Sequence, residues 1–344
     1  MMQRWRGIGV GTVLAMLSLS ACSSSSDSGS GETAVTTLPP LAKKTSYKVG
    51  FVQVWEENNP WRNANTASIQ AEAAKRGYEL VFETGSGFGA TDEVARMNAV
   101  IAAKVDVIII APQDPTVLAP SIVAARRAGI PVFIEDRSID NDVAVPGLDY
   151  VSYLGSDFTK EGASTAQWLI AHPPAAGVKI LELEGTVGSS PAVNRKKGFD
   201  AEIAAQPEMT ILDSQSGNFN KSEGYATIKP MLAAHPEATV IFSHNDEMSL
   251  GVIQALTEMG KKPGDIQIVS IDGEKAGVQA VKDGWIGAIA ECNPRFGRIC
   301  FDTIEQYADG QMIPLQVKNT DRLFDMSTDA DSAALDAYIQ NEAF

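Results

Sequence analysis

The feature that most constrains this chain is an alternation of short apolar runs with longer amphipathic stretches, which begins at Tyr47 and restarts after Tyr153. Apolar runs such as 105–110 are rich in Val and Ile and have the length of strands buried on both faces. The stretches between them have helical length, and one of them begins with Asn59 as a cap and Pro60 in the first turn. Strands that alternate with helices predict right-handed βαβ units and parallel sheets. We therefore expect an α/β fold with two similar doubly wound lobes.

The expected elements follow one another with little chain between them. The expected strands are 48–54, 78–83, 105–110, one from 132, 178–183, 210–213, 239–242, 266–271 and 286–290. The expected helices are 60–76, 91–103, 116–128, 159–171, 191–204, one from 221, 247–259, 274–282 and 294–308. A short strand and an irregular tail are expected after the last helix.

The bulk properties of the chain exclude several classes of function. Its 344 residues exceed what one compact core usually needs, which favours two domains. Its formal net charge of −15 argues against a nucleic-acid partner. Its three cysteines and three histidines form no CxxC or Cys/His cluster, so no zinc site is expected. The acidic run 140–142 lacks the spacing of a calcium loop, and we expect neither a metal nor a cofactor.

Cys292 and Cys300 are the cysteines of the globular body. They can form a disulfide if the chain is exported, but the expected helix between them fixes a separation that the sequence does not give. Two partly buried free thiols are the favoured interpretation, and a disulfide remains the alternative.

The N-terminus has the pattern of an export signal followed by a tether. Arg4 and Arg6 precede an apolar stretch, 7–19, which is too short to span a membrane comfortably. This stretch ends in Leu-Ser-Ala-Cys at Cys22, which resembles a bacterial lipoprotein signal; an ordinary signal peptide is the alternative. The Ser/Gly-rich sequence that follows is typical of a flexible linker. We expect a signal peptide at 1–21 and a lipid on Cys22, with a tether at 22–45 that holds the exported body at the periplasmic or extracellular face of the cell membrane.

Polar side chains follow the expected strands at the points where the strands end. The apolar run 131–134 is followed directly by Glu135, Asp136 and Arg137. In open parallel sheets, ligands bind beyond the carboxyl ends of the strands. An Asp–Arg pair there offers acceptors beside a rigid fork of donors, which suits a polyhydroxylated molecule. A local ion pair in a solvated loop is the alternative, and Glu135 is expected to face solvent.

The same pattern recurs in both halves of the chain, and this recurrence favours a ligand site. The strand ends supply polar groups at Glu57, Arg62, Gln113, Asp114, Arg195, Asn245, Asp246, Asp272 and Glu291. A sugar requires such a set, because each hydroxyl donates and accepts while its C–H face packs on an aromatic ring. Trp61 is the favoured ring, and Phe219 is either a second ring or a core residue. Arg195 is assigned to the site, and the following lysines, 196–197, to a solvated helix face.

Several segments of the body resemble the periplasmic sugar-binding proteins of ABC importers. They are 61–62, 136–140, 185–188, 195–199, 215–219, 244–248 and 270–273. The match runs from about Tyr47 to the tail, and the branch it resembles most is that of galactofuranose-binding proteins and their fructose-binding relatives. This resemblance implies the type I periplasmic binding fold and a binding role rather than catalysis. The sugar contacts that it implies are Trp61, Arg62, Asp136, Arg137, Arg195, Asn245, Asp272 and Glu291, with Phe219 and Asp246 also at motif positions.

The resemblance also implies where the lobes divide. We expect a first lobe of 46–155 plus 292–320 and a second of 156–291 plus 321–344, with a ligand cleft between them. The chain would cross between lobes near 154–157, 291–294 and 319–322. Two departures from the galactofuranose branch flank the expected site: Pro191 and the bulky turn 55–59.

The expected function is that of a monomeric substrate-binding lipoprotein, which delivers a monosaccharide, in a galactofuranose-like form, to an ABC permease. Alternatives within this class are another pentose, fructose or a polyol as ligand, or a sensor that signals to a membrane receptor. An enzyme is disfavoured, because the Gly-rich loop 85–89 has GxGxG spacing rather than that of a phosphate loop and no GxSxG motif occurs. A sugar-responsive repressor is excluded, because a signal segment stands where a DNA-binding domain would lie.

Overall fold

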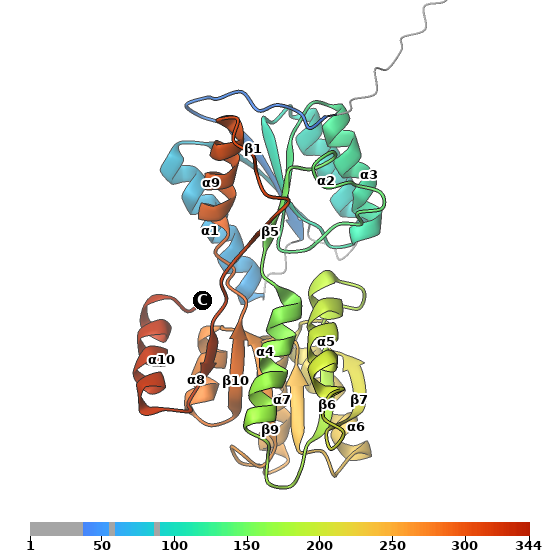
Figure 1. Cartoon of the computed structure of the whole chain (residues 1–344), viewed down its shortest axis with the longest axis vertical. Helices are drawn as coiled ribbons and strands as arrows, with labels where there is room; N and C mark the ends of the chain where they lie inside the picture. The colour runs from blue at the N-terminus through green and yellow to red at the C-terminus, as the bar shows by residue number, and fades with distance from the viewer. Residues whose placement is uncertain (1–36, 55–58, 86–89) are drawn as a thin grey trace, which may run out of the picture. The chain divides into compact units, whose positions relative to one another are not determined.

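The computed structural model describes residues 37–54, 59–85 and 90–344. The expected signal peptide, Cys22, most of the tether, Glu57 and most of the Gly-rich loop lie outside the described residues. Within the described residues, the strands form two six-stranded sheets, each flanked by helices (Figure 1). No helix in this part of the chain has both the length and the apolar character needed to cross a membrane.

The first lobe is built on a sheet whose strands are all parallel, in the order β11-β5-β4-β3-β1-β2. Its strands are β1 (Lys48–Val54), β2 (Glu79–Gly85), β3 (Val107–Ala111), β4 (Val132–Glu135), β5 (Ser152–Gly155) and β11 (Gln316–Lys318). Its helices are α1 (Pro60–Arg76), α2 (Ala90–Ala102), α3 (Pro115–Arg127) and α9 (Gly297–Ala308).

The second lobe repeats this order of strands as β12-β10-β9-β8-β6-β7, in which only β12 runs antiparallel to its neighbour. Its strands are β6 (Lys179–Glu184), β7 (Thr210–Ser216), β8 (Val240–Ser243), β9 (Gln267–Asp272), β10 (Ile286–Glu291) and β12 (Leu323–Asp325). Its helices are α4 (Phe158–Ala171), α5 (Ser190–Ile203), α6 (Lys221–Ala234), α7 (Asp246–Glu258), α8 (Lys275–Lys282) and α10 (Asp329–Asn341).

The chain passes between the two sheets three times. It leaves the first sheet after β5 and enters α4, returns between β10 and α9, and passes back between β11 and β12 (Figure 1). The expected fold class, two doubly wound lobes joined by a three-stranded hinge, is therefore confirmed. In each sheet the strand order reverses beside the first strand, and this reversal is where ligands of such folds bind.

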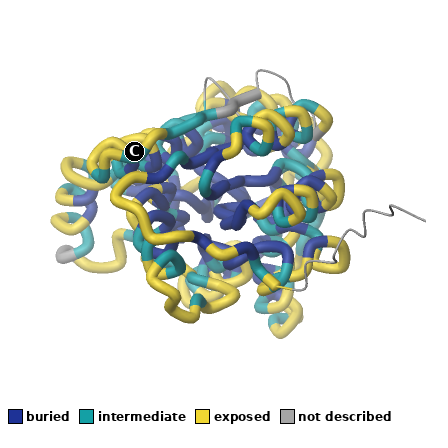
Figure 2. The backbone as a smooth tube through the Cα atoms, turned by 90° about the horizontal axis from the view of Figure 1, so that it is seen from above, coloured by how far each residue is buried: buried dark blue, intermediate teal, exposed yellow. Residues whose placement is uncertain are grey.

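Helices cover both faces of each sheet because the strands are apolar on both faces. All five residues of β3 are buried. In the first lobe, α1 and α9 pack on one face through residues such as Ile69 and Phe301, and α2 and α3 pack on the other through Met97 and Ile122. The buried backbone accordingly follows the strands and the inner sides of the helices (Figure 2).

Two glycines bring α4 and α5 into close backbone contact. A Cβ atom on Gly162 of α4 would collide with the carbonyl oxygen of Arg195, and one on Gly198 of α5 would collide with the carbonyl oxygen of Thr159. Only glycine leaves room for such an approach. The contact fixes the start of α4 against the segment of α5 that carries Arg195.

The tail differs from the expectation of an irregular segment. It contains two short strands and the helix α10, which begins with a capping box formed by Thr328 and Asp331. Leu335 and Tyr338 of α10 are buried in the second lobe. The capping residues that start α10 are present in the sequence, but the apolar face of this helix is short. The helix is stabilised by packing on the second lobe. Cys292 and Cys300 are both buried free thiols, which agrees with the favoured interpretation.

Candidate functional site

One pocket brings together side chains that follow strands of both lobes. Its lining comprises Asn59, Trp61, Arg62, Asp136, Arg137, Pro191, Arg195, Phe219, Asn245, Asp272 and Cys292. The pocket opens to solvent, and about 420 Å³ of space in and above it is not filled by atoms. Eight of the ten predicted ligand residues therefore line a single pocket.

The first lobe contributes a ring and a cluster of charges. Asn59 caps α1 by accepting from the backbone N of Arg62, and this cap places Trp61 and Arg62 in the first turn. The Arg62 guanidinium lies 4.9 Å from the centre of the Trp61 ring and forms a 2.6 Å ion pair with Asp136. Arg137, which follows β4, donates to the side-chain oxygen of Gln113 at 2.5 Å.

Gln113 and Glu93 hold Arg137 in place: Gln113 accepts from Arg137, and Glu93 in turn binds the backbone of Gln113. Both carboxylate oxygens of the buried Glu93 accept from the backbone N of Gln113, at 3.1 and 2.9 Å. Burial raises the pKa of Glu93 to about 7, against the effect of that hydrogen bond and of Arg137. The position of Arg137 thus depends on a residue of α2 that sequence reasoning did not single out.

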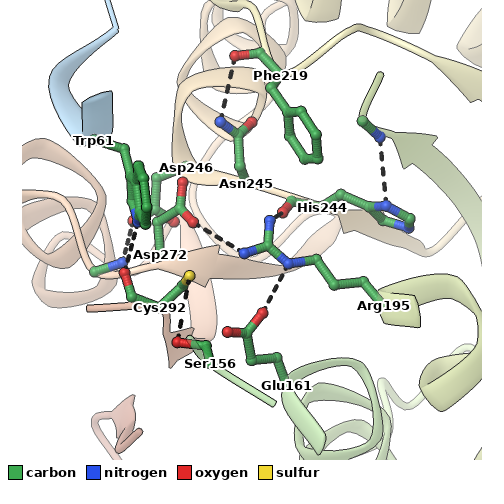
Figure 3. A network of polar contacts seen from close by, with 12 residues as sticks. Trp61, Ser156, Glu161, Arg195, Phe219, His244, Asn245, Asp246, Asp272 and Cys292 are labelled. Atoms are coloured by element: carbon green, nitrogen blue, oxygen red, sulfur yellow. Dashed lines mark hydrogen bonds and ion pairs between the residues drawn. The ribbon is translucent and has the colours of Figure 1, made fainter. Parts of the chain in front are cut away.

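The second lobe contributes Arg195, which is fixed by three acceptors (Figure 3). Its Nε donates to Glu161 at 2.8 Å, its Nη1 to the carbonyl oxygen of His244 at 2.6 Å, and its Nη2 to Asp272 at 3.3 Å. Burial opposes the charge of Arg195, but Glu161 and Asp272 outweigh it and hold its pKa above the usual value. Arg195 therefore remains a cation although only 3% of its surface is exposed.

Phe219 and Asn245 occupy the same side of the pocket. The Phe219 ring lies 5.6 Å from the Arg195 guanidinium carbon. Asn245 caps α7 with its side-chain oxygen and donates from Nδ2 to the carbonyl oxygen of Phe219 at 3.3 Å (Figure 3). The ring of Phe219 and the amide of Asn245 are thereby held together.

Three residues of the lining have backbone angles that side chains rarely adopt. The φ angles of Asp136, Phe219 and Asp272 are +55°, +59° and +132°. Such conformations cost about 1–3 kcal/mol each and gather at ligand sites, where the surrounding structure holds them. Their coincidence in one pocket marks this place as functional.

Two predicted site residues, Asp246 and Glu291, lie outside the lining. Asp246 is fully buried and accepts from the Ser270 hydroxyl at 2.6 Å and from the backbone N of Gly273 and Glu274 at 2.8 and 2.9 Å. Glu291 accepts two hydrogen bonds from Arg322, at 2.7 and 2.8 Å. Both carboxylates are thus occupied by the protein: Asp246 orders the loop after β9, and Glu291 ties two crossings together.

The structure corrects two expectations about neighbouring charges, one wholly and one in part. Glu135 does not face solvent: it is fully buried and accepts from Asn65 at 3.2 Å, because its side chain points to the α1 side of the sheet. Lys196 lies only partly on a solvated face, because its ammonium group pairs with the buried Glu182, whereas Lys197 is exposed as expected. Neither could be assigned from local sequence, because a charged residue beside a strand or on a helix reads as exposed.

Comparison with known proteins agrees with the fold and the site. A sequence profile of the periplasmic binding protein domain matches residues 49–312. The galactofuranose-binding protein YtfQ of Escherichia coli is 38% identical over 269 residues, which cover 77% of this chain and 83% of that protein.

Two solved structures are also similar. A Mycobacterium smegmatis protein in complex with β-D-fucofuranose has 34% identity and a TM-score of 0.77, covering 86% of this chain and 94% of that chain. The binding component of the arabinose ABC transporter from Shewanella sp. ANA-3, bound to α- and β-L-arabinofuranose, also has 34% identity and a TM-score of 0.77, covering 86% and 99%. The chain therefore belongs to the periplasmic binding protein family, whose exported sugar-binding members serve ABC importers, and it is a binding protein rather than an enzyme.

Proposed function

We propose that this chain is the lipid-anchored binding protein of an ABC sugar importer and that it binds a furanose of the galactofuranose type between its lobes. The observation that carries the proposal is the pocket itself, in which Arg62, Asp136 and Arg137 of one lobe and Arg195 and Asp272 of the other share one space. These groups both donate to and accept from hydroxyls. The proposed contacts also include Asn245 and the rings of Trp61 and Phe219, which suit the C–H faces of a sugar.

The furanose form is supported by the chemistry of the sugars that the similar proteins bind. D-galactofuranose, D-fucofuranose and L-arabinofuranose carry the same configuration at C2, C3 and C4. They differ only in the arm attached to C4. A pocket that recognises the shared ring would accept all three, and the residues around the arm, among which we place Pro191, would select between them.

The proposed mechanism is closure of the two lobes on the sugar. A ligand that touches both lobes makes its full set of contacts only when they are closed, and this difference in contacts stabilises the closed form. The backbone N of Ser138 donates to the Ser190 hydroxyl at 3.0 Å, a direct hydrogen bond between the first lobe and α5 of the second. The closed protein would then deliver its sugar to the permease, while Cys22 and the tether after it keep a monomeric body at the membrane surface. The expected tether, 22–45, ends earlier than its predicted bound, because Leu41 is buried in the core of the first lobe and Tyr307 donates to the carbonyl oxygen of Pro39.

The proposal is tested by thermal-shift and calorimetric titration of residues 37–344 with D-galactose, D-fucose, L-arabinose, D-fructose, D-ribose, D-xylose and D-glucose. A sugar at about 100 times its Kd should stabilise the protein by roughly 2.7 kcal/mol. We expect stabilisation by the first three and loss of it in Arg137→Ala. The matched control is Arg127→Ala, an exposed arginine of the same lobe.

The ring form is tested by ¹³C NMR with sugar labelled at C1, because furanose and pyranose anomeric carbons give separate signals. Enrichment of the furanose signal in the bound fraction supports the proposal. A bound pyranose, or no stabilisation by any sugar of the panel, rules out the proposed ligand.

A further inference from the structure

Glu161 occupies a position that links the proposed sugar site to the hinge. It lies in the first turn of α4, directly after the first crossing, and only 2% of its surface is exposed. It does not line the sugar pocket, yet its Oε2 accepts from Nε of Arg195 at 2.8 Å (Figure 3). On its other side it lines a separate cavity of about 80 Å³, together with Glu291, Asp321 and Arg322 from the two later crossings.

We propose that Glu161 is a positioning residue for ligand binding, which holds the Arg195 guanidinium in the pocket through its negative charge. This inference rests on the proposed function, because it concerns the arginine of that site. Glu161 acts through Arg195 and does not itself contact the ligand.

The geometry makes Glu161 the anchor of the Arg195 side chain. Nε is the donor nearest the aliphatic stem, so a carboxylate there fixes the plane of the guanidinium group before the terminal nitrogens reach the pocket. The close contact of Gly162 with the backbone of Arg195 sets the distance between the two helices. The remaining contacts, with the His244 carbonyl and Asp272, hold the terminal nitrogens.

The charge of Glu161 is balanced by groups from every neighbouring segment. Arg195 of α5 and the Cys292 thiol of the second crossing favour the ionised form, whereas Asp321 of the third crossing disfavours it. Burial is the largest influence, and together these effects raise the pKa of Glu161 to about 7. Asp157, Lys160 and Arg322 line the cavity on the opposite side of the carboxylate.

The hinge cavity gives this carboxylate a route for proton exchange. Its volume exceeds the ~10–15 Å³ that one water needs, and its charged lining offers the polar partners that a buried water requires. A proton that arrives from this side neutralises Glu161 and removes the charge that holds Arg195. Sugar affinity should therefore fall as the pH decreases through the neutral range.

The test measures the Kd for L-arabinose and D-galactose at pH 8.0 and pH 5.5. The wild type should bind about tenfold more weakly at pH 5.5, the size expected when a charge-assisted hydrogen bond is weakened. Glu161→Gln should bind about tenfold more weakly at pH 8.0 and lose most of the pH dependence. Glu161→Asp, which keeps the charge on a shorter stem, should retain the pH dependence. The matched control Glu208→Gln, an exposed glutamate of the same lobe, should behave as the wild type.

A second readout needs no ligand. The Nε–H signal of Arg195 in ¹⁵N NMR, assigned by its absence in Arg195→Lys, should be displaced in Glu161→Gln and unchanged in Glu208→Gln. Equal affinities and equal pH dependence of wild type and Glu161→Gln would overturn the inference, as would an unmoved Nε–H signal. If Glu161→Gln does not fold, a wild-type affinity that is the same at both pH values overturns it. Failure of the wild type to bind any sugar refutes the proposed function instead, and the NMR comparison still decides whether Glu161 holds Arg195.

Discussion

The indole Nε1 of Trp61 donates a 2.8 Å hydrogen bond to the carbonyl oxygen of Cys292 (Figure 3). Trp61 belongs to the first turn of α1, and Cys292 is the first residue after β10, where the chain leaves the second sheet. The backbone N of Cys292 in turn donates to the carbonyl oxygen of Asp272 at 2.9 Å. Hydrogen bonds therefore connect Trp61 of the pocket, through Cys292 of the second crossing, to Asp272 of the pocket.

Replacing Trp61 by Phe should weaken sugar binding about five- to tenfold, because the ring keeps its stacking surface but loses the hydrogen bond that orients it. Calorimetric titration measures the change, with Trp285→Phe as the control because Trp285 packs in the second lobe away from the pocket. Unchanged affinity in Trp61→Phe would show that packing alone orients the ring.

Replacing Gly185 by Ala should displace the Phe219 ring, because a Cβ at this position would overlap the end of that ring. We expect at least a tenfold loss of affinity, comparable with the loss in Phe219→Ala, because the displaced ring no longer packs on the C–H face of the sugar. Val187→Ala, in the same turn but with an exposed side chain, is the control. Wild-type affinity in Gly185→Ala would mean that Phe219 is not a sugar contact.

The stability of the ligand-free protein should decrease as the pH rises from about 5 to 8. Burial and the neighbouring Asp136 raise the pKa of Glu135 from its ordinary 4.5 to about 8. Between these values the folded state binds more protons than the unfolded state, so stability falls with increasing pH. Glu135→Gln should reduce the fall in melting temperature between pH 5 and 8.5, with Glu93 and Glu161 accounting for part of what remains, and should melt above the wild type at pH 8.5. If the melting temperatures of the wild type and Glu135→Gln fall in parallel with increasing pH, Glu135 is not a cause of the decline.

Replacing Glu182 by Gln should destabilise the second lobe by about 2 kcal/mol at pH 7, because it removes the anion that is hydrogen-bonded to Lys196 and to His244, whose pKa burial lowers. Glu182 is fully buried and pairs with His244 at 3.1 Å and with Lys196. Burial opposes its charge, yet His244 and Lys196 outweigh burial and lower its pKa to about 2. This contribution is present above the ordinary pKa of 4.5 and is lost as the pH falls towards 2.

The matched control for Glu182 is Glu184→Gln, because Glu184 approaches the same Lys196 but is partly exposed. Its loss should cost at most about 1 kcal/mol. Urea unfolding of both variants measures the difference, and equal effects would contradict a special role for the buried pair.

Replacing Cys22 by Ala should abolish lipidation, because the thiol that would carry the lipid is gone, and the variant should leave the membrane fraction once the apolar stretch before it is cleaved. Fractionation and intact-mass measurement of the mature chain provide the readout. If the mature wild-type chain carries no added lipid mass, the proposed lipid anchor on Cys22 is wrong.

Most of the fold could be predicted from the sequence because strand burial and helix periodicity are local signals. The strand β1 and the helix α1 have the predicted bounds, since Val-rich alternation and the Asn59–Pro60 start are both explicit. The tail helix α10 was missed because its short apolar stripe is stabilised by contacts with the second lobe rather than by its own pattern.

The sequence by itself determined which residues stand at the ends of the strands, and so placed Asp136, Arg137, Asn245 and Asp272 near a common ligand. Only the tertiary structure decided which carboxylates remain available, because that depends on partners far away in the chain. In the structure, Asp246 accepts from the protein's own backbone and Glu291 accepts from Arg322. The structure also brings Glu161 into contact with Arg195, 34 residues away in sequence. The physical reason is that a strand end fixes where a side chain starts, whereas packing between helices fixes which donor or acceptor it meets.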